Sequence, residues 1–107
     1  MPRWLPKVIV RIRELAEHGA VILTLKAQRE LAQLGLGLDE EDARDVLRTL
    51  DVDDFFERRA SDATGEWMYV FKPAITAQRL YVKVIVRKSC VVISFHEDEE
   101  HDDEEAR

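Results

Sequence analysis

The sequence predicts an α+β fold, with N-terminal helices packed on one face of a small antiparallel β-sheet. The first half of the chain carries apolar residues at helical spacing. After Asp54 the chain changes to short runs rich in β-branched and aromatic residues, separated by turn-like breaks. With 107 residues and no internal repeat, we expect one domain around a single core.

An amphipathic helix is predicted over residues 4–17, where apolar residues recur at intervals of three and four. Pro6 falls in its first turn, where a missing N–H costs little, and Gly19 fits a C-terminal stop. The stretch AVILTL, residues 20–25, fits either a short strand or an extended connection.

Two further helices are predicted before the strands begin. The segment LKAQRELAQLG, residues 25–35, forms the second helix, which ends at Gly35 or Gly37. Asp39 is the expected N-cap of the third, because Asp42 stands three residues later, in the position of a capping box. The buried face of this third helix is expected to comprise Ala43, Val46, Leu47 and Leu50.

A polar junction, DVDD at residues 51–54, leads into four predicted strands. The loop SDATGE, residues 61–66, separates the first two strands, and Pro73 ends the second. The strand segments are FFERRAS, WMYVFKP, RLYVKVIVRK and CVVISF.

The last two strands can be placed in register if Lys88 and Ser89 form a two-residue turn. The cross-strand pairs are then Arg87–Cys90, Ile85–Val92, Lys83–Ser94 and Tyr81–His96. Because strand side chains alternate, these residues share one exposed face. The opposite face, toward the helices, carries Leu80, Val82, Val84, Val86, Val91, Ile93 and Phe95.

The formal net charge of −6 is concentrated at the C-terminus. Residues 97–107 contain eight acidic residues and one arginine, whereas residues 1–96 are nearly balanced. We therefore expect a folded domain over residues 1–96 and an acidic, disordered tail over residues 97–107. Because the charges of residues 1–96 nearly cancel, this domain can hold a local basic patch. The acidic tail would then screen that patch.

The composition indicates a cytoplasmic protein without a membrane partner. The single cysteine, Cys90, excludes an internal disulfide framework and fits a reducing compartment. No apolar run approaches the ~20 residues that a membrane helix needs. Arg11, Arg13 and Glu14 interrupt any signal-peptide core.

The side chains of the exposed face suit RNA. RNA carries its own nucleophile, the 2′-OH, so a metal-free nuclease needs a base, an acid for the departing 5′-oxygen and a cation for the charged phosphorane. His96 can act as base or acid near neutral pH, Tyr81 is a second proton donor, and Lys83 or an arginine is the cation. The same alternation also fits a solvated strand face without a function.

Two other functions, metal binding and DNA binding, have weaker support in the sequence. The histidines and carboxylates of HEDEEHDDEE could bind a divalent metal, but their spacing has no tetrahedral pattern. Residues 25–50 could form a DNA-binding helix-turn-helix, but acidic residues at the start of its second helix would repel phosphates.

Ordered short motifs give a more specific indication. They are LGLGLDEEDARDVLRTLDVDDFF, then Trp67 and VFKP, then LYVKVIV and VVISFHED. Over about residues 20–97 they resemble the MqsR family of type II toxins. The resemblance implies a RelE-like fold and a metal-independent endoribonuclease, an mRNA interferase that needs no cofactor. It also implies a cognate antitoxin that silences the toxin, with DNA contacted only through that antitoxin.

Carried over position by position, Tyr81 falls on the family's functional tyrosine, and Lys83 follows it as in the family. Three positions depart from the family pattern. Glu57 stands where a lysine is frequent, Met68 replaces a glutamine, and His96 replaces a lysine.

The resemblance and the exposed face together define the expected site. Arg58 or Arg59 is expected to supply the cation lost at Glu57, although arginine does not serve as a proton donor. The expected catalytic residues are Tyr81, Lys83 and His96, and the expected RNA-binding residues are Arg58, Arg59, Met68, Lys72, Arg79 and Arg87. The alternative is a non-catalytic RNA- or protein-binding module that has lost cleavage through the departures.

Overall fold

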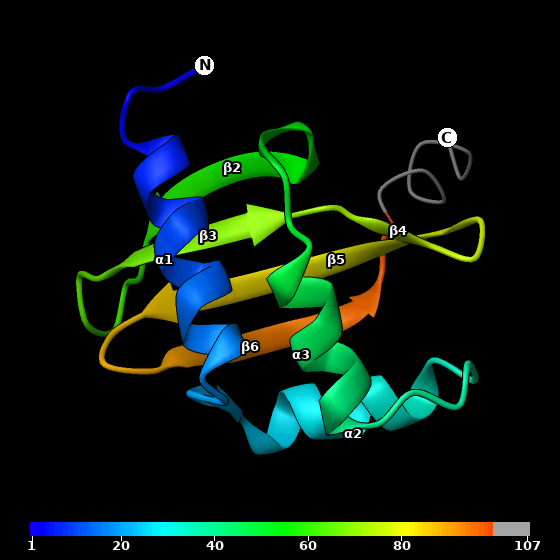
Figure 1. The fold of residues 1–107 in the computed structure, drawn as a ribbon. Helices are drawn as coiled ribbons and strands as arrows, with labels where there is room; N and C mark the ends of the chain where they lie inside the picture. The colour runs from blue at the N-terminus through cyan, green and yellow to red at the C-terminus, as the bar shows by residue number, and fades with distance from the viewer. Residues whose placement is uncertain (100–107) are drawn as a thin grey trace, which may run out of the picture.

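Two helices, α1 and α3, cover one face of a six-stranded sheet and a third, α2, lies along its β6 edge in the computed structural model, which describes residues 1–99 (Figure 1). In chain order the elements are α1 (Leu5–Glu17), β1 (Val21–Leu23), α2 (Leu25–Gln33), α3 (Glu40–Arg48), a 3₁₀ turn η1 (Val52–Asp54), β2 (Phe55–Ala60), β3 (Trp67–Phe71), β4 (Ala74–Ile75), β5 (Gln78–Val86) and β6 (Cys90–Glu97). No helix within residues 1–99 has the length and hydrophobicity needed to cross a membrane.

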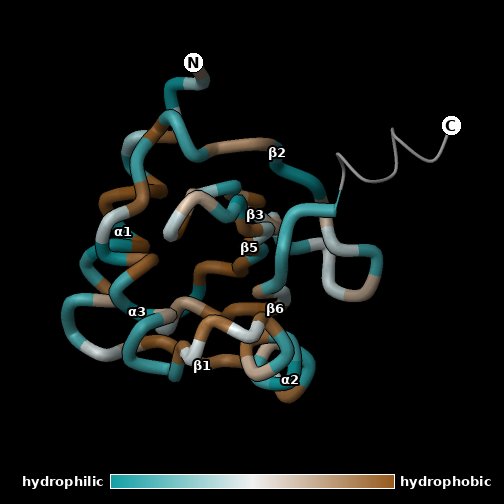
Figure 2. The backbone as a smooth tube through the Cα atoms, turned by 90° about the vertical axis from the view of Figure 1, so that its right-hand side faces the viewer, coloured by the Kyte–Doolittle hydropathy of each residue, from teal (hydrophilic) through white to brown (hydrophobic). Residues whose placement is uncertain are grey.

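The predicted α+β class is confirmed, but the sheet has six strands rather than the four predicted after Asp54, because β1 joins it and β4 was not predicted. The strand order is β1-β6-β5-β3-β2, and β4 pairs with β5 outside this path. The sheet is mixed rather than purely antiparallel, because β1 pairs in parallel with β6. Figure 2 shows α1 and α3 on one side of the sheet. The core between these helices and the sheet includes Phe71, Val82 and Phe95, all fully buried.

The first and third helices form where the sequence predicts them. α1 ends before Gly19, whose φ of 73° lies in the left-handed region that glycine adopts freely. At the start of α3, the Asp39 carboxylate accepts the N–H of Asp42, and the Asp42 carboxylate accepts the N–H of Asp39. This confirms the predicted capping box.

The second helix, α2, covers the edge of β6 that the short β1 leaves open. The Thr24 N–H donates to the carbonyl of Val92, and the Thr24 hydroxyl accepts the N–H of Ala27 to start α2. Farther along, the Glu30 carboxylate accepts the N–H of Phe95 at 3.0 Å. The rest of this strand edge is therefore protected from pairing with another chain.

The turn of the β5–β6 hairpin differs from the prediction. It contains three residues, 87–89, rather than Lys88 and Ser89 alone, because Val86 pairs with Cys90. The two predicted pairs nearest the turn, Arg87–Cys90 and Ile85–Val92, are therefore wrong. The observed pairs there are Val86–Cys90, Ile85–Val91 and Val84–Val92.

A β-bulge at Ile93 restores the predicted register at the far end of this hairpin. Beyond the bulge, Lys83 pairs with Ser94 and Tyr81 pairs with His96, as predicted. Below the bulge, the β6 side chains that face the helices are Cys90 and Val92, in place of the predicted Val91 and Ile93. The three-residue turn shifts the register of β6 by one residue from the prediction, and the extra residue in the bulge shifts it back.

The tip of the β4–β5 hairpin contains two non-glycine residues with left-handed backbone. Thr76 and Ala77 connect the paired residues Ile75 and Gln78, with φ angles of 45° and 67°. Left-handed backbone costs a non-glycine residue about 1–2 kcal/mol. Ala77→Gly is therefore expected to raise the free energy of unfolding by about 1 kcal/mol, measured by urea titration with an unchanged m-value. A lower free energy of unfolding in this variant would contradict the strained turn.

Candidate active site

The sheet face opposite the helices, called the open face below, collects the polar residues singled out in the sequence. Strand pairing gives its central row, which consists of Glu57, Val70, Lys83 and Ser94. On one side of this row lie Arg59, Met68, Ile85 and Val91, and on the other side lie Tyr81 and His96. Four strands thus contribute to one surface.

Tyr81 and His96 form a stacked pair on the open face. Their ring centroids are 4.9 Å apart, and their planes differ by 9°. The Nδ1 atom of His96 lies 2.7 Å from the carbonyl oxygen of Glu97. Because a carbonyl oxygen only accepts hydrogen bonds, Nδ1 carries the hydrogen and donates a hydrogen bond to this oxygen. The other ring nitrogen, Nε2, is left to exchange a proton with a substrate.

Lys83 is partly buried at the centre of the open face. No hydrogen bond or ion pair joins its ammonium group to any other residue within residues 1–99. Burial lowers the pKa of Lys83, and the positive charges of Lys26 and Arg59 lower it further. Glu30 and Glu57 oppose this effect without reversing it. A partly buried ammonium group with no counter-charge is a feature of sites that bind anions or transfer protons.

The sequence-based prediction missed the contribution of α2 to this face. Lys26 Nζ donates to Ser94 Oγ at 2.9 Å and lies 3.0 Å from the Glu30 carboxylate. Ser94 in turn is the cross-strand partner of Lys83. The helical pattern of residues 25–33 does not reveal this contact, because it arises only when α2 runs along the edge of β6.

The two arginines of β2 project from opposite faces, because strand side chains alternate. Arg59 lies on the open face, 3.6 Å from the Glu57 carboxylate. Arg58 lies on the helix side, with its guanidinium carbon 4.1 Å from the Trp4 ring centroid and 3.8 Å from the Trp67 ring centroid. The structure therefore does not bring Arg58 to the face that holds Tyr81 and His96.

Lys72 is enclosed rather than open to a phosphate. Its side chain is 3% exposed, and Nζ lies 3.4 Å from Asp98 and 3.6 Å from the Phe56 ring centroid. The sequence-based assignment of Lys72 to RNA binding is therefore revised. Arg79 is also near Asp98, at 3.9 Å, but its side chain is 66% exposed and remains available to RNA.

The acidic segment begins within the fold. Glu97 is the last residue of β6, and the Asp98 N–H donates to the carbonyl of Arg79. Residues 100–107, which include most of the predicted tail and most of its metal-binding candidate, lie outside the described residues. Within residues 1–99, no group of three or more histidine, cysteine, aspartate or glutamate side chains is arranged to hold a metal ion.

The remaining predicted contacts lie toward the turn end of the hairpin. Arg87 donates two hydrogen bonds to Glu66, at 2.8 and 2.6 Å, which lowers the pKa of that carboxyl to about 2. Met68 is on the open face beside Ile85. Burial raises the pKa of the Cys90 thiol to about 12, which fits an unreactive core residue.

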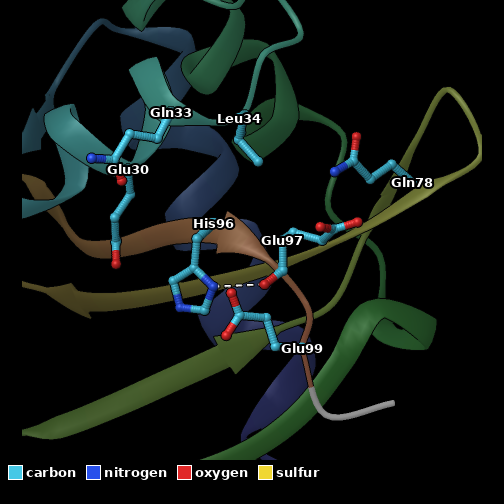
Figure 3. A pocket seen from close by; sticks show the side chains of 7 residues that line it. All are labelled: Glu30, Gln33, Leu34, Gln78, His96, Glu97 and Glu99. Atoms are coloured by element: carbon cyan, nitrogen blue, oxygen red, sulfur yellow. Dashed lines mark hydrogen bonds between the residues drawn. The ribbon is translucent and has the colours of Figure 1, made fainter. Parts of the chain in front are cut away.

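A pocket of about 210 Å³ opens beside His96 (Figure 3). Its lining consists of Glu30, Gln33, Leu34, Gln78, His96, Glu97 and Glu99. Figure 3 shows that the lining comes from α2, the start of β5 and the end of β6. Because these residues include carboxylates and no lysine or arginine, the pocket itself disfavours phosphate.

The comparison with known protein families identifies the class of the chain. A family model described as "Motility quorum-sensing regulator, toxin of MqsA" matches residues 8–97. None of the curated proteins matches the chain significantly. The matched region includes every strand and all but the first residues of α1. The chain therefore belongs to the MqsR family, the toxins of toxin–antitoxin systems.

Proposed function

We propose that this toxin is a metal-independent endoribonuclease that cleaves messenger RNA, with the 2′-OH of the RNA as nucleophile. The observation that carries the proposal is the stacked Tyr81–His96 pair beside Lys83, whose ammonium group has no hydrogen-bond or ion-pair partner among residues 1–99. A base, an acid and a cation thus lie together on one sheet face, as cleavage through the 2′-OH requires.

Each residue has a separate task in the proposed reaction. Neutral His96 accepts the 2′-OH proton at Nε2, while its Nδ1–H bond to the Glu97 carbonyl keeps the ring oriented. The 2′-oxygen attacks phosphorus, and the phosphorus–5′-oxygen bond breaks. Tyr81 gives its hydroxyl proton to the departing 5′-oxygen, and Lys83 stabilises the charged phosphorane. The products are a 2′,3′-cyclic phosphate and a 5′-hydroxyl end.

The three departures from the family pattern do not remove the base, the acid or the cation of the proposed reaction. Glu57 has an ion-pair partner, Arg59, on the same face, so the local charge is balanced. Met68 lies beside Ile85 and contributes an apolar contact in place of an amide. We assign phosphate contacts outside the reacting centre to Arg59 and Arg79.

The proposed partners follow from the family. We infer a cognate antitoxin that binds and silences the toxin, because the matching family is described as the toxin of a named partner. DNA contact is assigned to the antitoxin alone.

Lys83→Met is expected to slow RNA cleavage by about 10²- to 10³-fold without loss of stability. Burial holds the pKa of Lys83 below its ordinary value of 10.5, so the charged form is less stable in the folded protein than in the unfolded chain. This cost is fully present below the folded-state pKa and disappears as pH rises toward 10.5. Wild-type stability should therefore rise across this pH range relative to the variant.

Cleavage kinetics and urea unfolding at two pH values test both parts of this prediction. Lys88→Met, a change in the exposed β5–β6 turn, is the matched control and should leave the cleavage rate unchanged. A Lys83→Met protein that cleaves at the wild-type rate would remove Lys83 from the site.

The proposal as a whole is tested by incubating the purified protein with mixed messenger RNA in EDTA and mapping new 5′ ends. Discrete cuts are expected. A folded protein that makes no cuts, also when ribosomes are added, would favour the alternative of a non-catalytic RNA- or protein-binding module. Growth arrest on induced expression separates an active toxin from such a module.

A further inference from the structure

Two lysines lie next to Ser94 on the open face, and one of them, Lys26, contacts its side chain. Lys83 is the cross-strand partner of Ser94 on β5, and Lys26 of α2 donates to Ser94 Oγ at 2.9 Å. Ser94 is only 2% exposed, so the two lysines approach it from the surface. Residues from two elements far apart in the sequence thus form one cationic cluster.

The position of Lys26 is defined by several contacts. Its Nζ also lies 3.4 Å from the carbonyl oxygen of Ile93, the bulged residue of β6, and 3.0 Å from Glu30. Glu30 is itself held in place, because its other carboxylate oxygen accepts the N–H of Phe95. The side chain of Lys26 is nevertheless 58% exposed, so it can reach a ligand without breaking the fold.

Within the described part of the chain, residues 1–99, no carboxylate forms an ion pair with Lys83. The groups that act on Lys83 are the cations Lys26 and Arg59 and the anions Glu30 and Glu57. Both anions are occupied by the other two cations, at 3.0 Å and 3.6 Å. Like charges held near a partly buried ammonium group raise its energy, and an added anion would offset this cost.

We propose that Lys26 and Lys83 together bind one phosphate group of the RNA beside the Tyr81–His96 pair. This proposal rests on the proposed ribonuclease function and adds a residue to it. Lys26 then supplies from α2 the cation that is missing at Glu57, a role that Arg58 cannot fill from the helix side. Lysine suits this position because its ammonium group is a compact, mobile charge.

The test uses a single-stranded DNA oligonucleotide, which has the phosphates of RNA but no 2′-OH and is therefore not cleaved. Its affinity for the full-length protein is measured by fluorescence anisotropy over a range of salt concentrations. Lys26→Gln is expected to weaken binding and to reduce the slope of log affinity against log salt by about 0.7, the loss of one phosphate contact. Lys26→Arg should restore the slope, and Lys7→Gln on α1 should leave it unchanged.

A second readout separates a phosphate contact from a structural role. Removing Lys26 removes a positive neighbour of Lys83, so the pKa of Lys83 should rise. The alkaline limb of the cleavage–pH profile should then move to higher pH in Lys26→Gln, while urea unfolding stays close to wild type.

The outcomes distinguish this inference from the proposed function. If RNA is cleaved but Lys26→Gln keeps the wild-type affinity and salt slope, the inference fails and the ribonuclease assignment stands. If the slope falls by the expected amount while no RNA is cleaved, the phosphate site stands without the catalytic assignment. A wild-type protein that shows no salt-dependent binding of the oligonucleotide would also overturn the inference.

Discussion

Replacing His96 by alanine is expected to slow RNA cleavage by about 10²- to 10⁴-fold, the usual contribution of a general base. The reason is the fixed tautomer, since the Nδ1 proton is bonded to the Glu97 carbonyl and only Nε2 can take the 2′-OH proton. The rate is measured in single-turnover reactions at saturating protein, so that a change in RNA affinity does not enter.

A matched control is His18→Ala, because His18 is an exposed histidine next to the C-terminus of α1 and lies outside the site. This control should cleave at the wild-type rate. An unchanged rate in His96→Ala would transfer the role of base to another residue.

Tyr81→Phe is expected to produce a loss of similar size, about 10²- to 10⁴-fold, because it removes the proposed proton donor to the 5′-oxygen. The substitution keeps the aromatic ring, so the stack on His96 at 4.9 Å and the cross-strand packing are retained. Cleavage should fall while the urea midpoint stays within the range of a surface substitution.

Tyr69→Phe is the matched control for this change. Tyr69 stands on the helix side of β3, where its ring centroid is 5.7 Å from that of Trp4. The Tyr69→Phe variant loses a tyrosine hydroxyl on the helix side of the sheet, so it should cleave RNA at the wild-type rate. A substrate with a better leaving group at the 5′-oxygen should be cleaved by Tyr81→Phe at nearly the wild-type rate, and failure of this rescue would argue against an acid role.

Local signals in the sequence were sufficient for most of the fold. The Asp39–Asp42 capping box, the stop at Gly19 and the alternation of β5 each depend on neighbours within a few residues. These short-range preferences agree with the structure, and the three helices and the four strands predicted after Asp54 are present, whereas β4 was not predicted. The family resemblance is confirmed over residues 8–97.

The register of the β5–β6 hairpin could be predicted only in part from neighbouring residues. The pairs Tyr81–His96 and Lys83–Ser94 were correct, yet they depend on a bulge at Ile93 that the sequence does not signal. With the bulge, Cys90 and Val92 before it and Phe95 after it all lie in the core, in contact with residues distant in the chain.

The positions of the candidate site residues could be predicted only in part, because several of their contacts depend on tertiary structure. Arg58 and Arg59 are adjacent in sequence, and only the pairing of β2 with β3 reveals that Arg58 faces Trp4. The enclosure of Lys72 by Phe56 and Asp98 requires Asp98, just after β6, to reach Lys72, just after β3, although β5 lies between these two strands in the sheet. The contact of Lys26 with Ser94 spans most of the chain and has no local signature.

The most direct test of the proposed chemistry uses a short RNA that contains one mapped cleavage site, incubated with the wild-type protein in EDTA. A second RNA is identical except that the nucleotide on the 5′ side of the cut lacks its 2′-OH. The proposed mechanism predicts cleavage of the first RNA to a 2′,3′-cyclic phosphate and no cleavage of the second at that position. Equal cleavage of the two RNAs, or cleavage of the first only after Mg²⁺ is added, would contradict a metal-independent reaction through the 2′-OH.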